Sequence, residues 1–382
     1  MEGSETVQQN GIPKVYVIDG LLDLTLSVPT PASFDSRMAA CECIKAYFYN
    51  HPAIRKHFLR RAIDGHKTGA DETANVLTTL LQHLSHQVSG DPYRYWFAAV
   101  ILFHLINDDG DAKGLAMSLT EGDASSGEEV VTCIQSITEN LIIGIQKQVD
   151  ERVLVAYLML LTGWLYEDPD GVNDFLGEGS HIQSLVQAVL NTGPGGVLVS
   201  GLAAILLGIV YEFSTKDSPV PRATIHPILA SRMGRELYVD RISKLRSHPL
   251  LRDFEVLPQK LSSSPPGGLP EVFFDKTYVE FIKDNFSRIL RAIDRDPGME
   301  VPVISNGIQK GISREMVDSL RAQLEQKSKA LEKAEEDLLA LGRQLGQEQA
   351  DHRRARETST LELSRIKQVN DALQRHHDED VR

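Results

Sequence analysis

The sequence is short of cysteine and of positive charge, and each shortage excludes a class of protein. Three cysteines in 382 residues, Cys41, Cys43 and Cys133, are too few for a disulfide framework and are typical of a reducing compartment. The formal net charge of −13 argues against broad nucleic-acid binding, which needs a basic surface to neutralise phosphates. The first residues, MEGSETVQQNGIPK, lack the basic and apolar regions of a signal peptide, so we expect a protein that is not secreted.

The sequence also lacks the motifs of catalysis and metal binding. It has no Gly-x-Ser-x-Gly elbow, His-Glu-x-x-His pair or kinase signature. The turn Gly193-Pro-Gly-Gly196 lacks the Lys-Ser/Thr of a phosphate-binding loop. One residue separates Cys41 from Cys43, which on a helix turns the thiols about 200° apart, so we favour core positions over a zinc site. We therefore predict no enzyme activity, cofactor or metal; an active site assembled from distant residues is the alternative.

Long hydrophobic runs are scarce as well. Val153–Tyr166 and Val197–Tyr211 are 14 and 15 residues long. A membrane-spanning helix needs roughly 20 apolar residues, and shorter runs are typical of buried core helices. We therefore expect two buried helices, with a transmembrane helix as the alternative.

Helical patterns dominate from about Pro31 to Arg295, separated by short breakers rich in Asp, Gly and Pro. No stretch shows the sustained apolar–polar alternation of a strand. The fold class is therefore predicted to be all-α. The expected helices span Phe34–Asn50, Glu72–Val88, Tyr93–Ile106, Glu128–Gln146, Arg152–Tyr166, His181–Leu190, Val197–Phe213 and Val272–Ile293.

Parts of this helical region repeat. Leu161–Glu167 (LTGWLYE) aligns with Leu206–Glu212 (LLGIVYE) 45 residues later, and Leu102–Asp108 is a weaker match about 60 residues earlier. A period in the low to mid forties is typical of armadillo and HEAT units, which stack because a single unit cannot bury its apolar face. We therefore predict an armadillo/HEAT-like α-solenoid, in which the Val272–Ile293 helix is the last.

The composition changes after residue 311. From Ile312 to the end there is no proline and no aromatic residue, and apolar residues recur every three to four positions. This heptad pattern predicts a parallel dimeric coiled coil, most simply a homodimer, with a solvated single helix as the alternative. The predicted dimer interface is the seam of a and d positions, Val317, Leu320, Leu324, Leu331, Ala334, Leu338, Leu341, Leu345, Ile366, Val369 and Leu373.

Four regions follow from these patterns. We expect an N-terminal segment over residues 1–30 that is partial or irregular, and a helical head over 31–295. A linker with two prolines and three glycines covers 296–311, and the coiled coil covers 312–382. Composition and spacing alone predict an elongated, dimeric interaction protein.

Specific runs resemble the head of the Golgi vesicle-tethering factors known as general vesicular transport factors, or Uso-type tethers. These runs include Tyr93–Asp108 (YRYWFAAVILFHLIND), Leu161–Glu167, Asp174-Phe-Leu176, Gly208–Phe213 and Arg232-Met-Gly-Arg235. The resemblance covers roughly residues 10–295. It implies the C-terminal part of an armadillo-like head and the start of a shortened rod, as in a fragment or a truncated gene product.

The resemblance also implies a function. Such a protein would be cytoplasmic, lie peripherally on Golgi membranes and transport vesicles, and tether vesicles between the endoplasmic reticulum and the Golgi and within the Golgi. Its expected partners are a Rab-type GTPase, SNARE proteins and golgins, with no nucleic acid; no motif marks the partner-binding residues. An armadillo-type cargo adaptor or scaffold unrelated to vesicles is the alternative, but it gives no reason for the rod.

Overall fold

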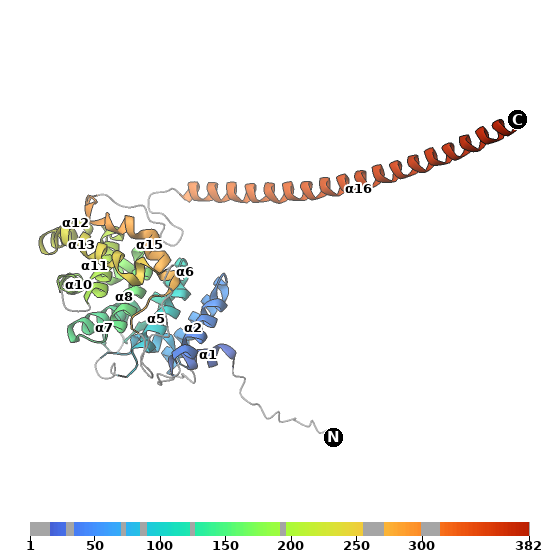
Figure 1. Cartoon of the computed structure of the whole chain (residues 1–382). Coiled ribbons are helices and arrows are strands. Elements are labelled where there is room, and N and C mark those ends of the chain that lie inside the picture. Colours follow the sequence, from blue (N-terminus) through green and yellow to red (C-terminus); the bar gives the residue numbers. More distant parts are fainter. Residues whose placement is uncertain are drawn as a thin grey trace, which may run out of the picture. The chain divides into compact units, whose positions relative to one another are not determined.

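The computed structural model describes residues 16–27, 34–69, 74–84, 90–122, 127–191, 196–254, 271–298 and 314–381, with side chains omitted at 314–325 and 332. The chain divides into two units between Lys310 and Gly311. We call the first unit the head and the second the rod, and describe each by itself (Figure 1). The four region boundaries predicted above stay predictions.

The described head is helical, which confirms the all-α prediction, apart from one two-residue strand pair. Its helices are α1 (Val17–Leu26), α2 (Phe34–Phe48), α3 (Pro52–Thr68), α4 (Val76–Leu81), α5 (Pro92–Ile106), α6 (Gly110–Met117), α7 (Cys133–Lys147), α8 (Glu151–Leu165), α9 (Pro169–Phe175), α10 (Ser180–Leu190), α11 (Gly196–Phe213), α12 (Arg222–Arg232), α13 (Gly234–Ser247), α14 (Pro249–Arg252), α15 (Lys276–Leu290) and the 3₁₀ helix η4 (Ala292–Asp294). The strands β1 (Thr120–Glu121) and β2 (Val131–Thr132) pair antiparallel.

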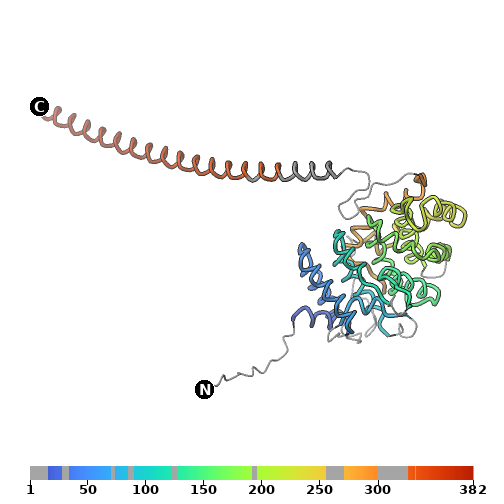
Figure 2. Tube along the Cα trace, turned by 180° about the vertical axis from the view of Figure 1, so that it is seen from behind, coloured from blue at the N-terminus to red at the C-terminus, as the bar shows by residue number. Residues whose placement is uncertain are grey.

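The head is built on a row of three apolar helices. Helix α8 packs between α5 and α11, and each of the three also packs against the helix that precedes it, α4, α7 or α10. Figure 2 follows this order along the chain, from the light-blue to the yellow-green helices. Residues Val153–Leu165 are all buried, because α8 has neighbours on every side.

Two glycines in this row let a neighbouring helix approach closely. A Cβ atom at Gly163 of α8 would overlap the ring of Phe103 of α5, and one at Gly208 of α11 would overlap the hydroxyl of Tyr238 of α13. Only glycine leaves room for these aromatic groups at such short range.

The two hydrophobic runs form α8 and α11, and both are buried. Helix α11 is long and apolar enough to cross a membrane by length and composition, but 83% of this stretch is buried in the head. The burial supports the expectation of a core helix, because the packed neighbours cover its apolar side chains.

The turn that ends α5 is repeated at the end of α8. Asp108 and Glu167 adopt the left-handed conformation, with φ of 53° and 54°. The next residues, Asp109 and Asp168, each accept a backbone hydrogen bond at the start of the following short helix. Leu102–Asp108 is therefore the structural counterpart of Leu161–Glu167. The stronger sequence match, Leu206–Glu212, differs because α11 continues as a helix to Phe213.

Several helix boundaries differ from the prediction. The helix expected from Glu128 begins at Cys133, because Thr132 and Gln135 form a capping box directly after β2. The side chain of Asn75 caps α4 by accepting from the backbone N–H groups of Leu77 and Thr78, so the helix expected over Glu72–Val88 begins at Val76, and it ends at Leu81. Seven helices of the described head were not predicted, namely α1, α3, α6, α9 and α12–α14. Charged residues dilute the apolar pattern of α3, α12 and α13, and α6, α9 and α14 are short.

The rod is one helix, α16 (Arg314–Asp380), of 67 residues. At 1.5 Å per residue this corresponds to a length of about 100 Å. Every side chain that is described along it is exposed.

Candidate interaction surfaces

The predicted dimer seam lies on α16. Its described large apolar residues are strongly exposed, for example Leu331 (62%), Leu338 (69%) and Leu345 (57%). Ile366, Val369 and Leu373 continue the same exposed series, as do Ala334 and Leu341. Val317, Leu320 and Leu324 lie in the helix, but their side chains are outside the described residues. The pairing of this seam with a second chain stays a prediction.

Three exposed leucines of α16 lie outside the seam. Leu339, Leu361 and Leu363 occupy other heptad positions and are 63%, 69% and 65% exposed. They are as accessible as the seam residues, so they provide matched controls for substitutions within it.

A second surface is formed by residues 271–298, which we call the strap. The strap contains α15 and η4, and it runs along the row of core helices instead of extending it. At its start, Tyr93 of α5 donates a hydrogen bond to the carbonyl oxygen of Glu271, and Trp96 Nε1 donates to that of Phe273 at 3.0 Å. The Val272–Ile293 helix predicted to be last therefore returns to α5 instead of simply following α14.

The strap is anchored at its beginning by Asp275, whose side chain is 1% exposed. One carboxylate oxygen lies 2.6 Å from Lys45 Nζ of α2, and the other lies 3.0 Å from His104 Nε2 of α5. The backbone N–H groups of Thr277 and Tyr278 also donate to it, so Asp275 is the N-cap of α15. Burial alone would raise the pKa of Asp275, but the hydrogen bonds and charges of His104 and Lys45 outweigh burial and hold it below its usual range.

The middle of the strap packs against α11, α8 and α13 through its apolar face, and Tyr278 also reaches Phe103 of α5. Tyr278, Ile282, Phe286 and Ile289 are buried, as expected for the core-facing side of an amphipathic helix. The hydroxyl of Tyr278 hydrogen-bonds to that of Thr162 at 2.9 Å, so the polar tip of this buried ring is also satisfied.

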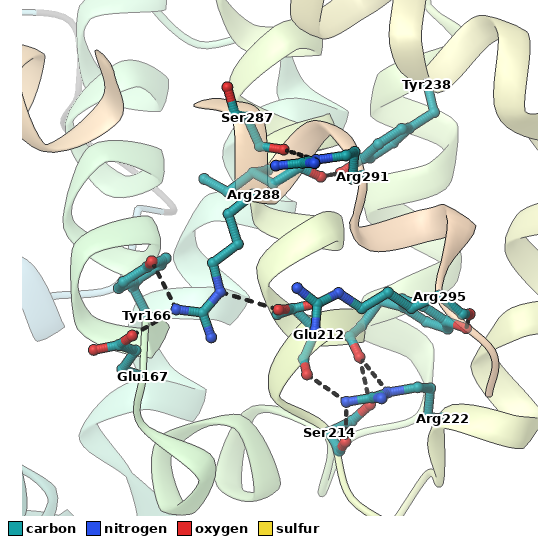
Figure 3. Close-up of polar contacts among 12 residues, drawn as sticks. Tyr166, Glu167, Glu212, Ser214, Arg222, Tyr238, Ser287, Arg288, Arg291 and Arg295 are labelled. Atoms are coloured by element: carbon teal, nitrogen blue, oxygen red, sulfur yellow. Dashed lines mark hydrogen bonds and ion pairs between the residues drawn. The ribbon is translucent and has the colours of Figure 1, made fainter. Parts of the chain in front are cut away.

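The end of the strap is held by Glu212, the one acidic residue of α11. Its side chain is 2% exposed, and its two oxygens lie 3.0 Å from Arg288 Nε and 3.0 Å from Arg295 Nε. Arg288 also bonds to Glu167 at 2.6 Å and to the Tyr166 hydroxyl at 3.2 Å. Figure 3 shows this guanidinium between the turn that ends α8 and Glu212. The strap thus joins the ends of two core helices through one arginine.

A neighbouring arginine binds the carbonyl oxygens at the C-terminal end of α11. Arg222 donates to the carbonyl oxygens of Tyr211 and Ser214, at 2.9 and 3.0 Å, and to that of Glu212 (Figure 3). These carbonyls have no partner within the helix, and a cation is favourable at a helix C-terminus. Arg222 therefore supports the backbone from which Glu212 projects.

A cavity of about 970 Å³ lies beside the start of the strap. Its lining includes Lys45, Tyr49, Arg55, Asp108 and Asp275. The lining contains both positive and negative side chains, so its charge favours no one class of ligand.

The cysteines are in separate environments. Cys41 and Cys133 are buried, whereas Cys43 is exposed, so the expectation of a core position holds for Cys41 and is wrong for Cys43. No group of three or more His, Cys, Asp or Glu side chains suited to a metal ion occurs among the described residues.

The head is a stack of helices with a strap packed along it, and the rod is a long helix with an exposed apolar seam. Together these two features define a class of helical interaction proteins. Residues 2–293 match the family model described as Uso1/p115-like vesicle tethering protein, head region. The chain belongs to this family, as the resemblance in the sequence indicated.

Two curated relatives are intracellular protein transport proteins. The Saccharomyces cerevisiae protein USO1 is 24% identical over 78% of this chain and 19% of its own length. The Schizosaccharomyces pombe protein uso1 is 29% identical over 50% of this chain and 19% of its own length. This chain therefore spans about a fifth of the length of the curated relatives it matches.

Two crystal structures show the same fold. Those of Uso1-1 and Uso1-2 superimpose with TM-scores of 0.66 and 0.63, at 25% and 26% sequence identity. The matches cover 74% and 73% of this chain, and 43% and 42% of the crystallised chains.

The seam stays a prediction from the sequence, and the contacts of the strap were not predicted. Lys45, His104 and Asp275 are brought together from three distant helices, and nothing in their spacing indicates this. The one local signal was Asp275 before an amphipathic stretch, which is typical of a helix N-cap. The charge contacts of Glu212 had no local signal.

Proposed function

We propose that this chain acts in vesicle tethering, in transport from the endoplasmic reticulum to the Golgi and within the Golgi. In this proposal an armadillo-like solenoid head contacts a Rab-type GTPase, SNARE proteins and golgins, and a parallel coiled coil joins two heads into a homodimer. The dimer holds vesicles to acceptor membranes and promotes docking and fusion. It lies peripherally on Golgi and vesicle membranes, facing the cytoplasm, and has no enzymatic activity.

The observation that carries the proposal is the family match, which extends over residues 2–293. The names of the yeast relatives, as intracellular protein transport proteins, are consistent with it. The row of packed core helices and the repeated turn at Asp108 and Glu167 support an armadillo-like solenoid.

The exposed seam of α16 supports dimerisation. Burying a leucine side chain is worth about 1.5–3 kcal/mol, so apolar positions repeating along one helix favour a partner helix. Two chains related by symmetry provide identical seams, which makes a homodimer the simplest pair.

The first test replaces two seam leucines, in the variant Leu331→Asp/Leu338→Asp. A dimer loses four buried leucines, worth about 6 kcal/mol or more, so association should weaken by at least about 10⁴-fold. Analytical ultracentrifugation should show a dimer for the unmodified chain and a monomer for the variant, while circular dichroism shows a folded head.

The control is Leu339→Asp/Leu361→Asp, which replaces equally exposed leucines outside the seam. It should remain dimeric. A dimeric seam variant, or a monomeric control, would contradict the seam assignment.

The second test separates binding from tethering. Liposomes that carry an early-secretory Rab, loaded with GTP or GDP, are mixed with the chain, and bound protein and liposome clustering are both measured. GTP-selective binding with clustering by the unmodified chain, and binding without clustering by the seam variant, is the expected result. Absence of GTP-selective binding by a folded dimer would contradict the assignment of the Rab site to these residues.

A further inference from the structure

The strap is the last described part of the head before the chain continues to the rod. Residue 298 is its end, and α16 begins at Arg314. Among the described residues of the head, the end of the strap is therefore the first to receive a pulling force applied through the rod, whatever the orientation of the two units.

The contacts that resist this force are made mostly by side chains. Arg295 binds Glu212, and its carbonyl oxygen accepts a hydrogen bond from the Tyr211 hydroxyl at 2.8 Å. Asp294 is held by Arg235 of α13 at 2.5 and 3.0 Å. These contacts link positions 59 to 84 residues apart in the sequence.

The core row does not depend on the strap for its backbone hydrogen bonds. Helices α5, α8 and α11 pack directly against one another, and their hydrogen bonds lie within each helix. Residues Glu280, Asp284 and Ser287 on the outer side of α15 are exposed, so the strap is covered on one side only. Removing the strap therefore breaks the interface between α15 and the row and leaves each core helix intact.

We propose that the strap is a mechanically releasable element. Under tension from the rod it detaches from its C-terminal end, before the core row unfolds, and uncovers the aromatic face formed by Phe103, Tyr166 and Phe213. These rings now contact Tyr278, Phe281 and the guanidinium of Arg288. The inference rests on the proposed tethering function only for the source of the tension.

The size of the event follows from the chain length. Release of the strap frees residues 271–298, which extend by roughly 95 Å at 3.3–3.6 Å per residue. Unfolding of the head from residue 16 to residue 298 would instead free roughly 950 Å. The two events differ enough to be identified in one force–extension trace.

The experiment pulls single full-length chains in optical tweezers through enzymatic tags at the two termini. We expect a short, reversible event of the smaller size before the large unfolding events. The test variant, Arg235→Gln/Arg295→Gln, removes two ion pairs across the strap, an exposed one to Asp294 and one to the buried Glu212. Its detachment should be at least about tenfold faster at the same force, because two exposed pairs together already change a rate by about one decade.

The control variant is Lys244→Gln/Arg252→Gln. It also removes two exposed ion pairs, Lys244–Asp240 within α13 and Arg252–Asp253 at the end of α14. Its short event should occur at the unmodified rate. Absence of the short event, or an equal change in both variants, would overturn the proposal. Each measurement uses a single chain, so a failure of dimerisation or of Rab binding leaves its outcome unaffected.

Discussion

Replacing Asp275 with alanine should lower the stability of the head more than replacing any other acidic residue of the strap. The change removes the N-cap of α15, worth about 1 kcal/mol. It also leaves Lys45 and His104 without their buried partner, which costs about 1–3 kcal/mol. Lys45 keeps its contact with Glu42 at 2.7 Å, so the lower part of that range applies.

The expected loss in the free energy of unfolding is therefore about 2 kcal/mol. For a unit of this size each kcal/mol lowers Tm by about 2 °C, so Asp275→Ala should melt about 4 °C lower. The measurement is thermal and urea unfolding of the full chain, followed by circular dichroism and tryptophan fluorescence.

Asp284→Ala is the control for this variant. Asp284 is exposed on the same helix, so its replacement should change the stability by less than about 0.5 kcal/mol. Asp275→Asn can still cap α15 but loses the charge, so it should lie between the two variants.

The effect of Asp275 depends on pH in a defined direction. Its pKa is lowered in the folded chain, so the ionised group stabilises the fold above its unfolded pKa of about 3.9. That contribution is lost as the pH falls through 3.9 towards the folded pKa. The difference between the unmodified chain and Asp275→Asn should shrink below about pH 4. A difference that grows as the pH falls below about 4, or equal stability of Asp275→Ala and Asp284→Ala, would refute the reasoning.

Two further predictions concern the core. Burial raises the pKa of the Cys41 and Cys133 thiols, so a maleimide at neutral pH should label only Cys43, with the other two reacting after denaturation, as mass spectrometry would detect. Gly163→Val should force the ring of Phe103 out of place and cost about 1–3 kcal/mol or more, measured by urea unfolding; an unchanged midpoint would contradict the packing of α5 on α8.

The parts of the fold that could be predicted are those with local signals. Helices α5 and α8 begin and end within one or two residues of the prediction, because Asp91-Pro92 and Asp150 mark their starts and their apolar runs are long. The start of α7 was missed because a two-residue strand stands where the helical pattern had already begun. So short a pair has too few residues to show a periodicity.

The position of the strap could not be predicted for a different reason. Its amphipathic pattern identifies a helix with one buried face, but not the surface that buries it. That surface is set by contacts such as Tyr93 with Glu271 and Trp96 with Phe273, which join residues 178 and 177 positions apart. The same holds for Glu212, an acid at the end of an apolar helix whose two arginines lie more than 70 residues later.

The apolar character of α11 has a consequence for the time at which the head can fold during synthesis. Part of its cover comes from α13 and α15, which are translated after it. About 85 further residues must be made between Phe213 and residue 298, which takes roughly 4–17 s at 5–20 residues per second. For that interval a helix with the length and hydropathy of a membrane span lacks part of its covering, and the nascent chain is open to chaperones, aggregation or mistargeting to a membrane. Truncations that end before the strap would make this exposed state permanent.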